Sequence, residues 1–407
     1  MNKYAKNLIF EIENKYADVF ENIDDIALHN QEKVLNAFAT NHISTLNFYP
    51  STGYGYDDMG RIGLCNVFAS IFNADKAIVS PLIMSGTHAI SIALAGLLTS
   101  GDTVLCPIDK PYDTLYSVIN SDNQLSLKNS GVKFDYIPYI EDVDYTAFEQ
   151  KLLKQPTMVY IQRSRGYAWR GALSIEKISK IIDFTRKISP NSIIFVDNCY
   201  GEFMEKLEPT DVGADVIAGS LIKNPGGGIA PTGGYIAGKE HLIDRISYRY
   251  SAPSLGMEIG SYSAGYREFY QGIFVAPHVS AGALKGAFLV ARTLEQFRFE
   301  TLPRITDTLD DIVCTIKLNT KEQLLAFCKA VQSTSPVEAY VTPVPNDMPG
   351  YDNQVIMAAG TFVQGASIEL SADAPITEPY IVYMQGGLTY EHIKIALANI
   401  LESLKLV

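Results

Sequence analysis

From about residue 76 onward, short apolar runs alternate with helical segments, and this alternation restricts the fold more than any other feature. Runs rich in Val and Ile, such as 77–79, 158–161 and 192–196, are separated by segments of helical length. Strands joined by helices form mainly parallel sheets that are covered on both faces. We therefore expect an α/β protein with a large, mainly parallel sheet. Further expected strands are 103–106, 134–138 and 216–220, and expected helices are 88–98, 111–120 and 175–188.

The two ends of the chain show different patterns. Residues 3–40 carry apolar side chains at three- and four-residue steps, which predicts a helical arm. After about residue 280 we expect a long helix (281–296), short strands around Lys317, Thr320 and 355–360, and a closing helix (390–406). The predicted organisation is an N-terminal arm (1–50), a large α/β domain (51–290) and a small α+β domain (291–407).

Composition excludes several classes of function. The chain has 33 basic and 45 acidic residues, a net charge of −12, which disfavours binding to nucleic acid or anionic lipid. No stretch approaches the run of about 20 apolar residues that a membrane span needs. The five cysteines are scattered and the six histidines lack metal-ligand spacing, so we expect a cytoplasmic protein without a metal site.

A strand that ends in an acid is followed by a strand that ends near a lysine. Asp197 ends the first, and Lys223 lies 26 residues later, before three glycines. Pyridoxal phosphate (PLP) requires a lysine for its Schiff base and a carboxylate beside its pyridine nitrogen. The functional groups of such sheets lie just past the carboxyl ends of the strands. The alternative is an Asp that caps a turn and a surface Lys, but the ordered pair favours PLP.

Three further elements are compatible with a PLP site. The turn Ser85-Gly86-Thr87 opens a helix of small residues, and bare N–H groups at a helix N-terminus bind phosphate. Many helices begin with such residues, so the turn alone is a weak signal. Ser220, three residues before Lys223, offers a hydroxyl to the same phosphate. Tyr112 follows the strand at 103–106 and is suited to cover a flat ring; an ordinary core tyrosine is the alternative.

Taken in order, these motifs resemble a known family. The segments 85–89 (S-G-T-H-A), 111–115 (P-Y-D-T-L), 196–202 (V-D-N-C-Y-G-E) and 220–238 resemble fold-type I, aspartate-aminotransferase-like PLP enzymes. More narrowly, they and segments 54–61, 162–170 and 385–390 are similar to the methionine γ-lyase-like, aluminium-resistance branch of the Cys/Met-metabolism enzymes. The resemblance implies a seven-stranded, mainly parallel sheet in the large domain.

The resemblance also implies roles for individual residues. Lys223 would form the internal aldimine and then move protons, Asp197 would pair with the pyridinium, and Tyr112 would stack on the ring and assist proton transfer. Tyr56 and Arg61 would reach the phosphate from a neighbouring subunit, so the protein would be a homodimer or homotetramer. Tyr54 is the alternative to Tyr56 and a candidate for contact with the substrate. The implied phosphate-binding residues are Ser85, Gly86, Thr87 and Ser220.

One departure concerns the substrate. Lyases of this group bind the substrate α-carboxylate with an arginine of the small domain, near the position of Thr377, but the last arginine here is Arg304. Either Arg163 or Arg165 supplies this contact, or the substrate is unusual. The resemblance implies a PLP-dependent carbon–sulfur lyase that performs β- or γ-elimination or replacement. The alternatives are an aldolase-, cyclase- or aminotransferase-like PLP enzyme and a PLP-binding protein with little turnover.

Overall fold

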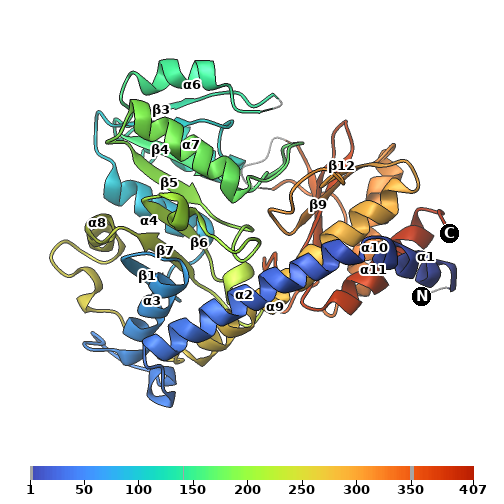
Figure 1. Ribbon diagram of the computed structural model, residues 1–407, viewed down its shortest axis with the longest axis horizontal. Coiled ribbons are helices and arrows are strands. Elements are labelled where there is room, and N and C mark those ends of the chain that lie inside the picture. Colours follow the sequence, from blue (N-terminus) through green and yellow to red (C-terminus); the bar gives the residue numbers. More distant parts are fainter. Residues whose placement is uncertain (1–2, 141, 349–352) are drawn as a thin grey trace.

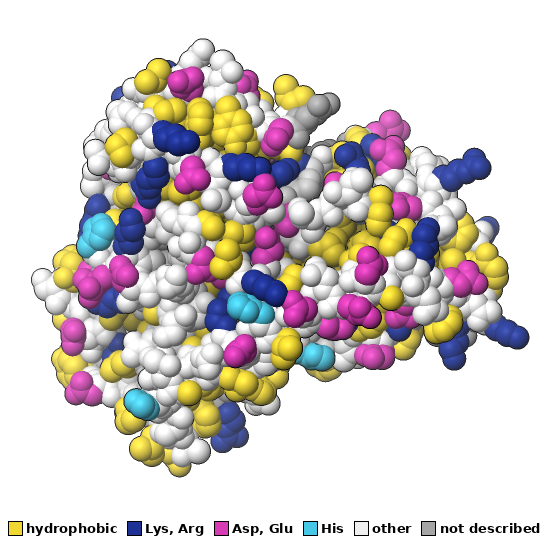
Figure 2. Space-filling view, in the orientation of Figure 1, with side chains coloured by type: hydrophobic (Ala, Val, Ile, Leu, Met, Phe, Trp, Pro, Cys, Tyr) yellow, Lys and Arg dark blue, Asp and Glu magenta, His cyan; other side chains and the backbone are white. Residues whose placement is uncertain are grey.

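The computed structural model describes residues 3–140, 142–348 and 353–407 and shows two lobes joined by long helices (Figure 1). Acidic and basic side chains are interspersed over the face shown in Figure 2. The α-helices are α1 (Lys3–Lys15), α2 (Ala17–Thr40), α3 (Met59–Ile71), α4 (Gly86–Leu97), α5 (Asp113–Asn120), α6 (Tyr145–Leu152), α7 (Ile175–Ile188), α8 (Glu240–Tyr250), α9 (Arg267–Glu295), α10 (Lys321–Thr334) and α11 (Tyr390–Ser403). Short 3₁₀ turns are η1 (Thr45–Phe48), η2 (Pro209–Val212), η3 (Asn224–Gly226) and η4 (Gly256–Glu258).

The large lobe is built on a seven-stranded sheet, which confirms the predicted fold class. Its order is β1-β7-β6-β5-β4-β2-β3, and β7 is antiparallel to both of its neighbours. Alternate side chains of each strand enter different cores: Ile194 and Val196 pack with α3 and α7, whereas Phe195 packs with α4 and α8. The strands are β1 (Lys76–Ser80), β2 (Thr103–Cys106), β3 (Lys133–Tyr136), β4 (Met158–Gln162), β5 (Ile193–Asp197), β6 (Val216–Ser220) and β7 (Gly234–Gly238).

The small lobe contains an antiparallel sheet in the order β10-β11-β12-β9-β8. Its strands are β8 (Glu300–Leu302), β9 (Val313–Lys317), β10 (Val355–Ala358), β11 (Ser371–Pro375) and β12 (Ile381–Gln385). The expected strand at Thr320 is wrong, because the Thr320 hydroxyl accepts a hydrogen bond from the Gln323 N–H and caps α10.

One face of the small sheet is apolar and the other is polar. Cys314, Ile316, Val382 and Met384 belong to the core that α10 and α11 complete. Because side chains alternate along a strand, Thr315, Tyr383 and Asp373 point the other way, and the strand register aligns all three. This polar face looks towards the large lobe, because Asp373 and Tyr383 line a cavity together with large-lobe residues such as Lys223.

The N-terminal arm is two helices that break at Tyr16. The apolar face of α1 (Ala5, Ile9 and Ile12) packs into the core of the small lobe, and α2 runs beside α9 (Figure 1). The expected loop over 51–61 ends at Asp58, whose carboxylate accepts a hydrogen bond from the Arg61 N–H and begins α3.

Among the described residues, α9 is the one helix long and apolar enough to cross a membrane, with a window of mean hydropathy 1.5. This differs from the expectation that no stretch approaches such a length. Inside the protein 72% of that window is buried, and α9 contributes Ile273 to the large-lobe core and Leu289 to the small-lobe core. The apolarity of α9 is therefore explained by its position as the core helix shared by both lobes.

Candidate active site

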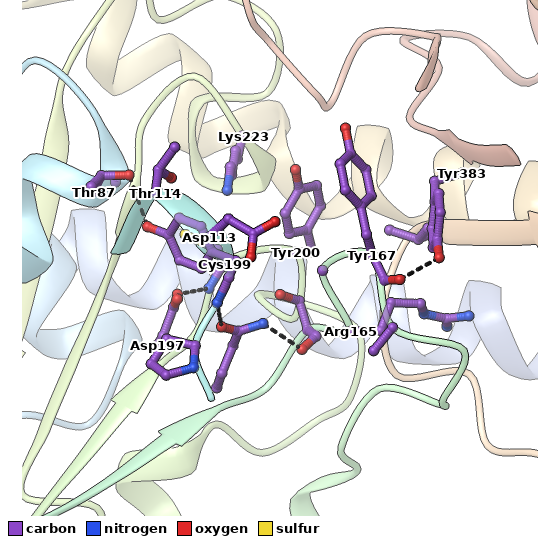
Figure 3. Close-up of a pocket in the computed structure, with 18 of the residues that line it drawn as sticks. Thr87, Asp113, Thr114, Arg165, Tyr167, Asp197, Cys199, Tyr200, Lys223 and Tyr383 are labelled. Carbon is purple, nitrogen blue, oxygen red and sulfur yellow. Dashed lines mark hydrogen bonds between the residues drawn. The ribbon is translucent and has the colours of Figure 1, made fainter. Parts of the chain in front are cut away.

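A cavity of about 480 Å³ lies between the carboxyl ends of β4, β5 and β6 and the polar face of the small sheet (Figure 3). Its size is typical of small-molecule sites. The predicted residues that line it are Ser85, Gly86, Thr87, Tyr112, Arg165, Asp197, Ser220 and Lys223. Eight of the twelve residues predicted from sequence therefore meet in one place.

Asp197 is the buried acid of this cavity. It ends β5 and is 1% exposed; its Oδ1 accepts a hydrogen bond from the Cys199 N–H (3.1 Å) and its Oδ2 from the Tyr160 hydroxyl (3.2 Å). Burial raises the pKa of Asp197, and the nearby Lys223 opposes that rise in part. A buried carboxylate of this kind is suited to hold a protonated pyridine nitrogen.

Lys223 lies three residues past β6, the parallel neighbour of β5. Its Nζ is 4.0 Å from the centroid of the Tyr200 ring. Burial by itself lowers the pKa of Lys223, but the acidic groups around it, Cys199 first, more than offset this, and the pKa is raised. The next residue, Asn224, donates hydrogen bonds to the Tyr200 and Glu202 carbonyls (3.1 and 3.0 Å), which fixes the lysine turn against the turn that follows Asp197.

The N-terminus of α4 forms an anion cradle at one end of the cavity. Ser85 caps the helix by accepting a hydrogen bond from the His88 N–H (3.1 Å), while the Gly86 and Thr87 N–H groups have no partner among the described residues. A Cβ at Gly86 would lie 3.2 Å from Cys199 Sγ and 3.4 Å from Ser220 Cβ, so glycine lets the three segments approach closely. The cradle fits a phosphate.

Tyr112 lies at the start of α5, and both its hydroxyl and its backbone N–H form hydrogen bonds. Its hydroxyl is 2.8 Å from Thr87 Oγ1, and its backbone N–H donates to Gln162 Oε1 (2.8 Å). Burial raises the pKa of the phenol, so the hydroxyl stays protonated and can donate. Gln162, the last residue of β4, is a positioning residue that sequence reasoning did not single out.

The two candidate arginines have different environments. Arg163 is fully buried outside the cavity lining, and its guanidinium donates to Asn198, Glu205 and backbone carbonyls. The structure therefore does not bring Arg163 into the cavity, which corrects that half of the prediction. Arg165 lines the cavity and forms a forked pair with Asp311 (2.9 and 3.3 Å) while a third nitrogen donates to Thr315 (3.2 Å).

Tyr54, Tyr56 and Arg61 do not line the cavity of the chain that carries them. Tyr54 and Tyr56 are 66% and 65% exposed, with ring centroids 5.5 Å apart. The Arg61 guanidinium donates to the backbone carbonyls of Gly55, Met257 and Gly260. Their predicted role across a subunit interface stays a prediction.

The small-lobe wall was not predicted. Tyr383 and Gln385 of β12 and Asp373 of β11 line the cavity, and the Tyr383 hydroxyl donates to the Tyr167 carbonyl (2.5 Å). Within the described residues no group of three or more His, Cys, Asp or Glu side chains is arranged to hold a metal ion.

Comparison with known proteins decides the family. The family model for methionine γ-lyase matches residues 5–405. This chain belongs to the methionine γ-lyase family. Enzymes of this family are PLP-dependent carbon–sulfur lyases, and the chain is an enzyme of that type.

Several relatives match over nearly the whole chain. A carbon–sulfur lyase involved in aluminium resistance from Clostridium novyi NT has 47% sequence identity to this chain. Its crystal structure superposes with a TM-score of 0.94, and the match covers 100% of this chain and 97% of that one. A Listeria monocytogenes protein involved in aluminium resistance is 49% identical with TM-score 0.96, covering 98% and 100%. The uncharacterized protein YnbB of Bacillus subtilis is 46% identical, covering 98% of this chain and 96% of YnbB. Cystathionine γ-synthase from Xanthomonas oryzae, at 15% identity and TM-score 0.62, shares the fold.

Proposed function

We propose that this enzyme removes or replaces a β- or γ-substituent of an amino acid, with PLP bound at Lys223. The preferred substituent is linked through sulfur and leaves as a thiol. The observation that carries the proposal is the convergence of Lys223, Asp197 and Tyr112 on one cavity beside the α4 cradle. When bound, PLP would accept the electrons released as a bond at the substrate Cα breaks.

The large-lobe residues would bind and orient that cofactor. The Gly86 and Thr87 N–H groups and the Ser220 hydroxyl would hold its phosphate. Asp197 would keep a proton on its ring nitrogen, and the Tyr160 and Cys199 hydrogen bonds hold the carboxylate in place. The Lys223 amine would bond to the cofactor and, once displaced by substrate, accept the Cα proton.

Two further residues would act on the substrate. Tyr112, whose raised pKa keeps its hydroxyl protonated, would donate a proton to the departing sulfur. Arg165 would bind the α-carboxylate: Asp311 and Thr315 engage three of its five N–H donors and leave two for substrate.

The test is to incubate the holoenzyme with S-substituted cysteines, cystathionine and methionine and to measure keto acid and ammonia. We expect stoichiometric release of both with the corresponding thiol. Absence of keto acid from the whole panel would exclude elimination.

A second candidate is an aldolase-, cyclase- or aminotransferase-like reaction on an unusual amino acid. It is favoured by the absence of any arginine after Arg304 and by the presence of Tyr383 and Gln385 on the small-lobe wall. Conversion of the cofactor to its amine form, or retro-aldol products, would support this candidate in place of elimination. A cofactor spectrum that no amino acid alters would support a PLP-binding protein with little turnover.

We also propose at least a homodimer with a shared active site, in which Tyr56 and Arg61 reach the partner's phosphate. Exposed rings at Tyr54 and Tyr56 are suited to an interface. Mixing two inactive variants, Tyr56→Ala and Lys223→Ala, would then restore activity through hybrid dimers, and a monomeric holoenzyme in light scattering would contradict the proposal.

A further inference from the structure

Asp373 is a cavity carboxylate without a cation partner. It lines the cavity, and its Oδ2 accepts a hydrogen bond from Gln385 Nε2 (3.2 Å). Within the described part of the chain no group donates to its Oδ1, and no Lys, Arg or His forms an ion pair with it. Burial raises the pKa of Asp373 to about 7, with only the Gln385 amide opposing the rise.

The sheet register explains why Asp373 faces the cavity. It lies opposite Tyr383, which in turn lies opposite Thr315, and all three occupy the polar face of the small sheet. The flanking Ala372 and Ala374 enter the core on the other face. The side chain is therefore fixed by the alternation of β11 and cannot turn to solvent without a change of register.

Asp373 lies on the wall that is opposite the cofactor-binding residues. Figure 3 shows Tyr383, its cross-strand neighbour, on the far side of the pocket from Lys223, with the Tyr200 and Tyr167 rings between them. Arg165 lies on that side as well, where Thr315 accepts its hydrogen bond. A substrate bonded near Lys223 with its carboxylate on Arg165 would thus extend its side chain towards Asp373.

An uncharged side chain entering this region would leave an ionised Asp373 dehydrated and unpaired, which is costly. A cationic group would instead pair with it through a charge-assisted hydrogen bond, with the Gln385 amide holding the second oxygen. We propose that Asp373 and Gln385 form a subsite for an ammonium group at the far end of the substrate. The substrate class is then an amino acid whose sulfur-linked leaving group carries a cation. The substrate class rests on the proposed elimination, whereas the subsite itself rests on the geometry around Asp373.

A matched pair of compounds tests the subsite. S-(2-aminoethyl)-L-cysteine and S-propyl-L-cysteine have the same shape but differ in one distal ammonium. At pH 8, where Asp373 is mostly ionised, we expect the wild-type holoenzyme to prefer the aminoethyl compound roughly 10- to 100-fold in kcat/KM. Asp373→Asn should abolish this preference while it still converts the propyl compound.

The control is Asp310→Asn. Asp310 is also a buried carboxyl whose pKa burial raises to about 7, but it does not line the cavity, so its removal should leave the preference unchanged. Equal use of both compounds by the wild type, or a preference that persists in Asp373→Asn, would overturn the subsite. A preference for an anionic S-carboxyethyl compound would overturn it too, since Asp373 would then act as a proton donor.

Binding separates this inference from the proposed function. Titrating each compound into the holoenzyme and following the cofactor absorbance measures affinity without turnover. If no keto acid forms but the Asp373-dependent preference in affinity remains, elimination fails and the subsite stands. If keto acid forms equally from both compounds, elimination stands and the subsite fails.

Discussion

The two walls of the cavity are built in different ways. The large-lobe wall consists of residues within a few positions of strand ends or helix starts: Asp197, Lys223, Ser220 and the Ser85–Thr87 turn. The small-lobe wall consists of alternate residues within antiparallel strands, such as Asp373, Tyr383 and Gln385. The first wall, which we propose binds the cofactor, leaves compact sequence motifs, whereas the second, which we propose faces the substrate, leaves none.

The largest effect is expected on the large-lobe wall. Lys223→Ala should lower kcat by roughly 10²- to 10⁴-fold or more, because the proposal assigns to this lysine both the bond to the cofactor and the acceptance of the Cα proton. The control is Lys239→Ala, because Lys239 forms an ion pair with Asp215 outside the cavity. Retention of turnover in Lys223→Ala would break the assignment of cofactor chemistry to this wall.

Arg165 joins the two walls, and removing it tests stability and binding together. Arg165→Ala leaves Asp311 buried and unpaired, so we expect the free energy of unfolding to fall by about 3–5 kcal/mol and KM to rise. The double variant Arg165→Met/Asp311→Leu should recover stability in a denaturant titration but not KM. Recovery of KM as well would show that Arg165 has no contact with substrate.

Glu202 makes the stability of the large lobe depend on pH, which gives a further test of the comparison. Glu202 is fully buried beside Gly219 of β6, behind the large-lobe wall, and burial raises its pKa to about 8 from an ordinary value of 4.5. The folded protein therefore binds this proton more tightly than the unfolded chain. The stabilisation is present below about pH 4.5 and is lost as pH rises towards 8.

We therefore expect wild-type stability to fall relative to Glu202→Gln between pH 5 and 8, on the order of 3 kcal/mol. Urea titrations of both proteins at each pH measure the difference. A difference that does not change with pH would show that Glu202 is ionised in the folded protein.

The smallest effect is expected for Gln162, which acts through Tyr112. Gln162→Leu removes the acceptor of the Tyr112 N–H, a hydrogen bond of about 1 kcal/mol, so kcat should fall roughly fivefold. Gln155→Leu removes a comparable amide outside the cavity and should leave kcat unchanged. Equal effects of both variants would indicate a general loss of stability.

The same contrast explains what the sequence predicted. The bounds of β6 and α7 agree with the structure because apolar runs end at recognisable turn and cap residues. The strand β7 was missed because glycines begin and end it, and β11 because Ser-Ala-Asp-Ala-Pro contains no β-branched residue. Arg163 and Arg165 are two residues apart, and only the turn after β4 sends one into the interior, where it contacts Asn198 and Glu205, and the other into the cavity.

The central claim is that Lys223 holds the cofactor, and borohydride reduction of the PLP-loaded protein followed by peptide mass mapping tests it most directly. We predict that the cofactor mass is found on the peptide that contains Lys223. Lys110 also lines the cavity, so the method distinguishes two lysines of the same site. A cofactor mass on Lys110 or on any other lysine, or no borohydride-stable adduct at all, would contradict the account.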